Sequence, residues 1–182
     1  MKYKITTLVE NCSYKRSLRG EHGLSLYIET PKHKILFDTG ASDLFIHNAH
    51  ALNIDLKQVN YLILSHGHND HTGGLRDFME LNQTARIVCK KEIFDPKFKD
   101  NRENGIKDTN LLDQSRFLYI NSIIELVPGI FIFPQIKIID SLDIHFDHFY
   151  TQRERKKIPD CFDDELAITL TTNSSFSIIS AC

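Results

Sequence analysis

The first third of the chain alternates short apolar segments with turns. Three segments rich in β-forming residues are candidate strands: Tyr3–Val9, Leu24–Glu29 and Lys34–Phe37. The second and third candidates are separated by Thr30-Pro31-Lys32-His33, a composition typical of a hairpin turn. These patterns predict a β-rich N-terminal region that contains at least one hairpin.

From residue 43 onward, the spacing of apolar residues changes to that of a helix. One helical face collects apolar side chains: Leu44, Phe45, Ala49 and Leu52. Either Ser42 or Asp43 is placed to cap the first turn of this helix. The run Val59–Leu64 that follows is short and almost continuously apolar, as expected of a strand that is covered on both faces.

The rest of the chain predicts a short helix at Leu75–Leu81 and further strands. The strand candidates are Ile87–Cys89, Ile123–Val127, Ile130–Phe133, Ile136–Ile139, Leu166–Leu170 and Phe176–Ala181. Pro128-Gly129 is the signature of a type II turn between two of them. Residues 95–110 are polar and aperiodic, so we expect a surface excursion there. The order of elements predicts a mixed α/β (α+β) fold with many hairpins, in a single domain over residues 1–182.

Composition limits the classes of function. The chain has 182 residues with 22 Lys or Arg and 24 Asp or Glu, a net charge of −2 that disfavours a broad basic face for nucleic acid. No apolar run approaches the ~18 residues of a membrane span, and the first residues lack the apolar core of a signal peptide. The four cysteines form no CxxC pair, which favours reduced thiols. We therefore expect a cytoplasmic protein with a small-molecule partner and no nucleic-acid or membrane partner.

The segment Ser65–Gly74 carries the candidate chemistry, because it contains the pattern His-x-His-x-Asp-His directly after a predicted buried strand. His66 and His68 point to the same side of an extended stretch, and a turn then aims Asp70 and His71 at a neighbouring position. Imidazole and carboxylate groups are ligands that zinc favours. The alternative is a chance cluster on a solvated loop. Four ligand-type side chains so close together after a strand favour a site for two metal ions.

At this point the sequence resembles the metallo-β-lactamase superfamily, through Leu62–Gly74 and Ile35–Gly40. The resemblance implies an αββα sandwich of four layers and an enzyme that uses two metal ions to activate water. Zinc is the ion expected, and iron and manganese also suit such ligands. By resemblance, the first ion is held by His66 and His68. The second is held by Asp70 and His71, and Asp70 also orients the nucleophile. Asp38 is the carboxylate that orients the metal-binding loop.

A narrower resemblance is to the branch named for dihydropterin-6-methyl-ribofuranosylaminobenzene-phosphate synthase. It is carried by Gly20–Ser25 and by Phe162–Ala167. Glu21 and His22 lie in a glycine-flanked loop, and the resemblance favours a role for them in binding substrate. A turn-forming role is the alternative. A metal-dependent hydrolase of a small phosphorylated or ester substrate is the first hypothesis, and synthase chemistry of this branch is the second.

The end of the sequence leads to a third hypothesis. In the branch, the last strand runs into Gly-Cys-Ser-His-x-Gly-Ile, and its histidine is expected to complete the first metal site. This chain ends at Ser180-Ala181-Cys182. We therefore expect a truncated fold with an incomplete second half and an uncovered sheet, which invites self-association into a homo-oligomer. Such a chain is either an enzyme or a remnant without turnover that binds metal weakly.

Two other segments contain clusters of charged or histidine side chains. The pattern Asp143-Ile144-His145-Phe146-Asp147-His148 holds possible metal ligands, but neither a predicted strand nor a glycine loop frames it, and a surface loop is the preferred interpretation. The basic run Arg153–Lys157 is most simply a solvated face.

Overall fold

The computed structural model describes residues 2–136 and 148–181, and its centre is a six-stranded sheet. The strands lie in the order β1 (Lys4–Val9), β2 (Ser25–Glu29), β3 (Lys34–Phe37), β4 (Tyr61–Ile63), β5 (Arg86–Cys89) and β8 (Phe117–Tyr119). The first three are antiparallel neighbours, whereas β3, β4, β5 and β8 run parallel to one another. The carboxyl ends of the parallel strands therefore meet at one edge of the sheet.

The central parallel strands β3, β4 and β5 are buried on both faces, as the continuous apolar run of β4 predicts. One row of side chains, Leu36, Leu62 and Ile87, belongs to the apolar core on the helix side of the sheet. The adjacent row belongs to the core on the opposite side and consists of Phe37, Ile63 and Val88. Successive strand residues alternate between the two faces, so a strand with no polar positions joins two cores.

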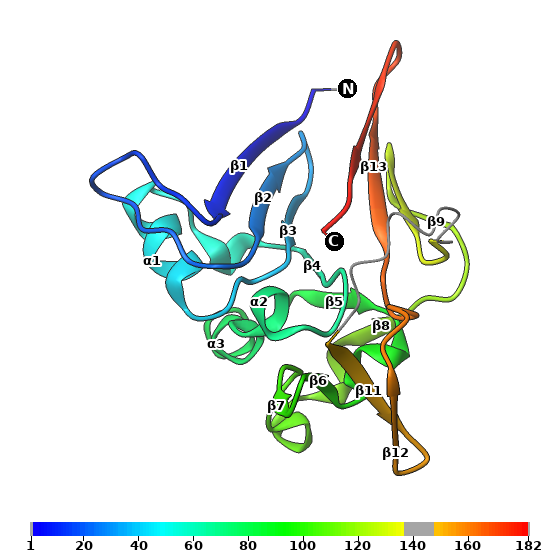
Figure 1. Cartoon of the computed structure of the whole chain (residues 1–182). Helices are drawn as coiled ribbons and strands as arrows, with labels where there is room; N and C mark the ends of the chain where they lie inside the picture. The colour runs from blue at the N-terminus through cyan, green and yellow to red at the C-terminus, as the bar shows by residue number, and fades with distance from the viewer. Residues whose placement is uncertain (1, 137–147, 182) are drawn as a thin grey trace.

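The structure has helices α1 (Leu44–Ala51) and α3 (Leu75–Leu81) on one face of this sheet, and a third, short helix, α2 (Asn69–Thr72), in the loop after β4 (Figure 1). Phe45 from α1 and Phe78 from α3 are fully buried in the core on this side. The predicted helices at 44–52 and 75–81 are confirmed, since the apolar stripe of each one is the face that packs on the sheet.

The helices are short, and α1 is capped by one of the two residues proposed. The hydroxyl Oγ of Ser42 accepts a hydrogen bond of 3.2 Å from the backbone N–H of Leu44. The Asp43 side chain makes no capping bond. Within residues 2–136 and 148–181, no helix has both the length and the apolar character needed to cross a bilayer.

A second sheet packs on the opposite face of the first. Its strands lie in the order β14 (Phe176–Ile179), β13 (Ala167–Thr171), β10 (Ile130–Phe133) and β9 (Ile124–Val127), and all neighbours are antiparallel. Gly129 joins β9 to β10 with φ of +80°, the left-handed value that a type II turn requires at this position. The helices and the two sheets thus form three successive layers, and the second core lies between the sheets (Figure 1).

The third sheet differs from the prediction. It has the strand order β12 (Lys156–Pro159), β11 (Phe149–Arg153), β6 (Lys97–Lys99) and β7 (Arg102–Glu103). The expected surface excursion at 95–110 therefore contains two strands, and the basic run contributes to a third and a fourth. Most of these residues are exposed as expected, but the strands were not predicted, because β6 pairs with β11, more than 50 residues later in the chain, through pairs such as Lys97 with Thr151. A pairing partner at that distance leaves no local periodicity.

Short 3₁₀ turns complete the description: η1 (Leu56–Gln58), η2 (Lys91–Phe94), η3 (Thr109–Leu111) and η4 (Gln114–Arg116). Most of the predicted strand 136–139 lies outside the described residues, as do Asp143, His145 and Asp147 of the acidic and histidine-rich segment. His148 from that segment is described, and its Nδ1 lies 2.8 Å from Oδ1 of the exposed Asp100.

The core between the two sheets is expected to contribute strongly to stability. Phe37 is fully buried there, so Phe37→Ala should lower the free energy of unfolding by about 3–5 kcal/mol, through lost burial and the cavity that remains. Phe176→Ala is the matched control, because Phe176 is 67% exposed. Urea unfolding followed by circular dichroism measures both. Equal losses for the two variants would show that the proposed core does not carry the stability.

Candidate metal centre

The loop after β4 brings three histidine rings together. His66, His68 and His71 are all buried. The centroid of the His66 ring lies 4.8 Å from that of His68 and 4.4 Å from that of His71. The short helix α2 supplies the turn predicted after His68, since it begins at Asn69. The structure therefore places the three imidazoles in one cluster at the carboxyl end of a central parallel strand.

Asp38 fastens this loop to the end of β3. Its carboxylate oxygen Oδ1 accepts the backbone N–H of Ser65 at 2.7 Å, and Oδ2 accepts the Ser65 hydroxyl at 2.7 Å. The same Oδ2 lies 2.8 Å from Nδ1 of His71. The Asp38 side chain is fully buried. One carboxylate thus joins both ends of the His-x-His-x-Asp-His segment, where the resemblance expects an orienting group.

Asp70 lies between two histidines. Its Oδ2 is 3.6 Å from Nε2 of His71 and 3.3 Å from Nε2 of His22. The His22 side chain is 81% exposed, and it stands at the outer side of the cluster. The backbone brings them together at Gly23, which has φ of +146° and where a Cβ would lie 2.3 Å from the carbonyl oxygen of Asp70. Only a glycine allows this approach.

Glu21 has a different environment from His22. Its Oε1 accepts the backbone N–H groups of Ala41 and Ser42 at 3.0 and 3.1 Å, and its Oε2 accepts the Ser42 hydroxyl at 2.6 Å. The carboxylate therefore braces the loop between β3 and α1. Of the two residues assigned to substrate, His22 faces the cluster, while Glu21 shapes the loop beside it.

Three further polar residues at the cluster were not among the predicted site residues. Asp164 accepts the backbone N–H of Gly67 at 2.7 Å, and Oδ2 of Asp160 lies 3.2 Å from Nε2 of His68. The Nζ of Lys97 on β6 lies within 3.0 Å of both carboxylates, and all three side chains are buried. Asp164 lies in the segment Phe162–Ala167 that carries the narrower resemblance, which was the available signal for it. Lys97 had none.

The site favours neutral imidazole at His66 and ionised carboxylate at Asp160. Burial lowers the pKa of His66 well below its ordinary value, and the neighbouring His71, His68 and Lys97 lower it further. Burial raises the pKa of Asp160, but the hydrogen bond to His68 and the charge of Lys97 outweigh it and bring the pKa to about 2. Neutral imidazole and carboxylate are the forms that bind metal ions.

The donor set fits a zinc-type ion by its chemistry, because imidazole nitrogens and carboxylate oxygens meet at one place. The arrangement of the atoms is not that of a coordination shell. Within residues 2–136 and 148–181, no group of three or more His, Cys, Asp or Glu side chains is arranged to hold a metal ion. Here the imidazoles of His68 and His71 each pair with a carboxylate, Asp160 and Asp38 respectively.

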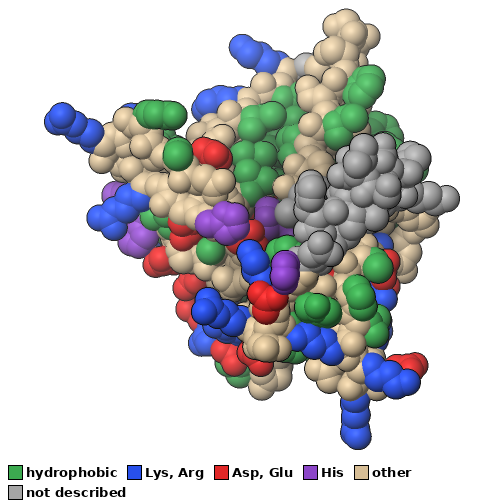
Figure 2. Space-filling view, viewed as in Figure 1, with side chains coloured by type: hydrophobic (Ala, Val, Ile, Leu, Met, Phe, Trp, Pro, Cys, Tyr) green, Lys and Arg blue, Asp and Glu red, His purple; other side chains and the backbone are tan. Residues whose placement is uncertain are grey.

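Histidine and acidic side chains are also visible at the surface, near the middle of the face shown in Figure 2.

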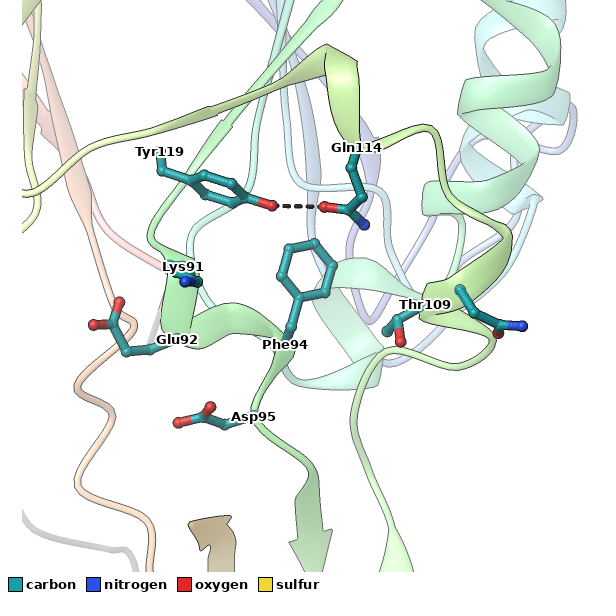
Figure 3. Close-up of a pocket in the computed structure, with 8 residues that line it drawn as sticks. Lys91, Glu92, Phe94, Asp95, Thr109, Gln114 and Tyr119 are labelled. Carbon is teal, nitrogen blue, oxygen red and sulfur yellow. Dashed lines mark hydrogen bonds between the residues drawn. The ribbon is translucent and has the colours of Figure 1, made fainter. Parts of the chain in front are cut away.

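A hollow of about 570 Å³ lies elsewhere, beside η2 (Figure 3). Its lining includes Phe94, Lys91 and Tyr119, and the Tyr119 hydroxyl donates a 2.7 Å hydrogen bond to Gln114. None of the predicted metal ligands lines this hollow. Among the residues that the structure describes, the histidine cluster and this hollow are therefore separate sites.

Comparison with known families agrees with the geometry. The sequence model of the metallo-beta-lactamase superfamily matches residues 18–136, about two thirds of the chain, including β2 to β5 and the whole histidine loop. The chain belongs to the metallo-beta-lactamase superfamily. The resemblance to this superfamily and the mixed α/β fold class expected from the order of elements are thereby confirmed.

Individual members of the superfamily are similar over almost the whole chain. The chain is 32% identical to a 7,8-dihydropterin-6-methyl-4-(beta-D-ribofuranosyl)-aminobenzene-5'-phosphate synthase of Methanocaldococcus jannaschii, over 98% of this chain and 67% of that protein. Among solved structures, Tm1679, a metal-dependent hydrolase of the beta-lactamase superfamily, superposes with a TM-score of 0.76 at 26% identity, over 98% of this chain and 65% of Tm1679. A quorum-quenching N-acyl homoserine lactone lactonase shares the fold, with a TM-score of 0.53 at 20% identity over 86% of this chain and 57% of that one. The chain thus spans about two thirds of the synthase and of Tm1679.

The bonds of Asp38 predict a measurable contribution to stability. Asp38→Asn replaces one acceptor oxygen with an amide that donates, so a buried donor loses its partner. We expect the free energy of unfolding of the metal-free chain to fall by about 1.5–3 kcal/mol, the range for a hydrogen bond to a charged group. Asp43→Asn is the matched control, because the Asp43 carboxylate is 56% exposed beside His47. Urea unfolding that gives equal stability for both variants would contradict the role of Asp38.

Proposed function

We propose that this chain is a metal-dependent hydrolase that acts on a small molecule. The observation that carries the proposal is the cluster of His66, His68 and His71 at the carboxyl end of β4, with the Asp70 carboxylate 3.6 Å from His71. The likeness to Tm1679, which is described as a metal-dependent hydrolase, supports it. The proposal also treats residues 1–182 as a single domain.

The proposed ligands are those of the sequence motif. His66 and His68 would hold one ion, and Asp70 and His71 would hold a second. Zinc suits this donor set best, and iron or manganese also suits it. Ions of this kind, when bound, lower the pKa of water to near neutrality and stabilise negative charge that develops on a substrate.

The neighbouring residues support a defined role for two of the three rings, those of His71 and His68. Asp38 contacts Nδ1 of His71, and Nε2 of the same ring is the nitrogen nearer Asp70. Asp160 contacts Nε2 of His68, so Nδ1 is the nitrogen proposed to bind the ion. Metal-binding histidines commonly donate their second ring N–H to a carboxylate, which fixes the orientation of the ring. The two carboxylates are placed to do this for His71 and His68.

His22 is the residue proposed to meet the substrate. It is the exposed member of the group, and its Nε2 lies 3.3 Å from Asp70, so a molecule that reaches the ions passes close to its ring. Imidazole can donate a hydrogen bond to a phosphoryl or carbonyl oxygen. Glu21 would act indirectly, by shaping the loop with Ala41 and Ser42.

A second candidate function is the synthase chemistry of the dihydropterin branch. It is favoured by the 32% identity to the synthase of Methanocaldococcus jannaschii over 98% of this chain. The same side chains would then bind a phosphorylated substrate for group transfer instead of hydrolysis.

Turnover of generic phosphodiester, ester and lactam substrates supports the hydrolase. Turnover only with a phosphorylated ribosyl substrate and a pterin supports the synthase. Metal binding without turnover of any of them supports a remnant.

Metal content tests the proposed ligands. The chain loaded with zinc and then dialysed should retain close to two ions, and His68→Ala should lose at least one of them together with any turnover. His47→Ala is the control, because the His47 side chain is 70% exposed and pairs with Asp43 on the surface of α1. Elemental analysis gives the result. A wild-type chain that retains no metal, or a His68→Ala variant that retains it fully, would refute this assignment.

Steady-state kinetics test His22. His22→Ala should raise KM about two- to tenfold, which corresponds to one lost hydrogen bond of about 0.5–1.5 kcal/mol. Metal content should stay the same, because His22 is not one of the four proposed ligands. The assay uses whichever substrate the wild-type chain turns over. An unchanged KM, or a loss of metal, would show that His22 has a different role.

A further inference from the structure

Lys97 is a buried lysine that the proposed function does not use. It lies on β6 in the third sheet, and its side chain has no exposed surface. Its Nζ lies 2.8 Å from Oδ1 of Asp164 and 3.0 Å from Oδ2 of Asp160. A buried ammonium is costly unless it is paired. The burial of Lys97 between two buried carboxylates therefore calls for a structural role, because a lysine that is merely solvated would lie at the surface.

Both carboxylates lead directly to the histidine loop. Asp164 uses its second oxygen, Oδ2, to accept the backbone N–H of Gly67 at 2.7 Å. Gly67 is the residue between His66 and His68. Asp160 is 3.2 Å from the ring nitrogen Nε2 of His68. Lys97 is thus one contact away from the backbone and from a ring of the proposed ligand segment.

The backbone around Lys97 is fastened to the same loop. The carbonyl of Lys97 accepts the N–H of Asn104 at 2.8 Å, and the carbonyl of Asn104 accepts the N–H of Asn69 at 2.8 Å. A Cβ at Gly105 would lie 3.0 Å from the backbone nitrogen of Lys97, so this turn packs closely against the backbone of the lysine. The strand therefore reaches the loop on both sides of His68, at Gly67 through Asp164 and at Asn69 through Asn104.

We propose that Lys97 is a positioning residue of the metal centre, which holds Asp160 and Asp164 in place so that they set the Gly67 backbone and the His68 ring. Without the ammonium, two buried negative charges that both lie within 3.0 Å of the same Nζ would lose the cation between them, and like charges repel strongly in a low-dielectric interior. The carboxylates would move apart, which disturbs the hydrogen bonds to Gly67 and His68.

The metal part of the test rests on the proposed function. Lys97→Met keeps most of the length of the side chain and removes its charge. We expect zinc affinity, measured by chelator competition, to fall about 10–100-fold, as is usual when a group that supports a ligand is lost. The absorption spectrum of bound Co²⁺ should change as well. Lys156→Met is the matched control, because Lys156 is an exposed lysine of β12, and its affinity and spectrum should equal those of the wild type.

A double variant tests whether Lys97 positions the two carboxylates or is required for the protein to fold at all. Lys97→Met combined with Asp164→Asn removes one positive and one negative charge, and the Asn oxygen can still accept the Gly67 N–H. We expect it to recover most of the zinc affinity. Full affinity in Lys97→Met alone would overturn the proposal. Failure of both variants to fold, shown by circular dichroism, would also overturn it, because Lys97 would then serve the fold as a whole.

Hydrogen exchange gives a readout that does not depend on metal. In the metal-free chain, the Gly67 amide should exchange faster in Lys97→Met than in the wild type, while the Ile87 amide inside the first sheet keeps its rate. If the wild type binds no metal but Gly67 responds in this way, the proposed function fails and the positioning role stands. An unchanged Gly67 rate would refute the positioning role whatever the metal content.

Discussion

The Asp38 carboxylate is the contact on which the arrangement of the site depends. Every polar atom of the residue is engaged: its N–H donates to Ile63, its carbonyl accepts the Ser25 hydroxyl, and its two carboxylate oxygens hold Ser65 and His71. Its backbone has φ of +58°, an uncommon value for a residue other than glycine. The surrounding bonds hold that conformation, and the end of β3 is thereby locked to the loop after β4.

Other parts of the fold bring residues from distant parts of the chain to the neighbourhood of Asp38 and the histidine loop. The parallel strands end at the same edge of the first sheet, so the loops after β3 and β4 meet there. The segment that leads from β12 to β13 adds Asp160 and Asp164, and the third sheet adds Lys97, which pairs with both of them. The third sheet is therefore more than a surface excursion, because its lysine supplies the positive charge that these two buried carboxylates need.

Local patterns predicted the elements that are stabilised by their own periodicity. The apolar stripe of α1, the continuous run of β4 and the Pro128-Gly129 turn all appear close to the expected positions. The strands β6 and β11 were missed, because their residues alternate poorly and are held by pairing across more than 50 positions. Likewise, the motif pointed to His66, His68, Asp70 and His71 as neighbours, whereas a single lysine in a polar segment offered no pattern from which its burial could be foreseen.

The sequence by itself determined the superfamily, the layered mixture of helices and sheets, and the four side chains proposed as metal ligands, because spacing within ten residues already constrains where those side chains can point. Only the tertiary structure decided which groups surround them. It showed that Glu21 braces a backbone loop while His22 faces Asp70, and that Lys97 lies between two buried aspartates. The physical reason is that burial and ionic pairing depend on segments far apart in the chain, which are brought together only when the three sheets are assembled.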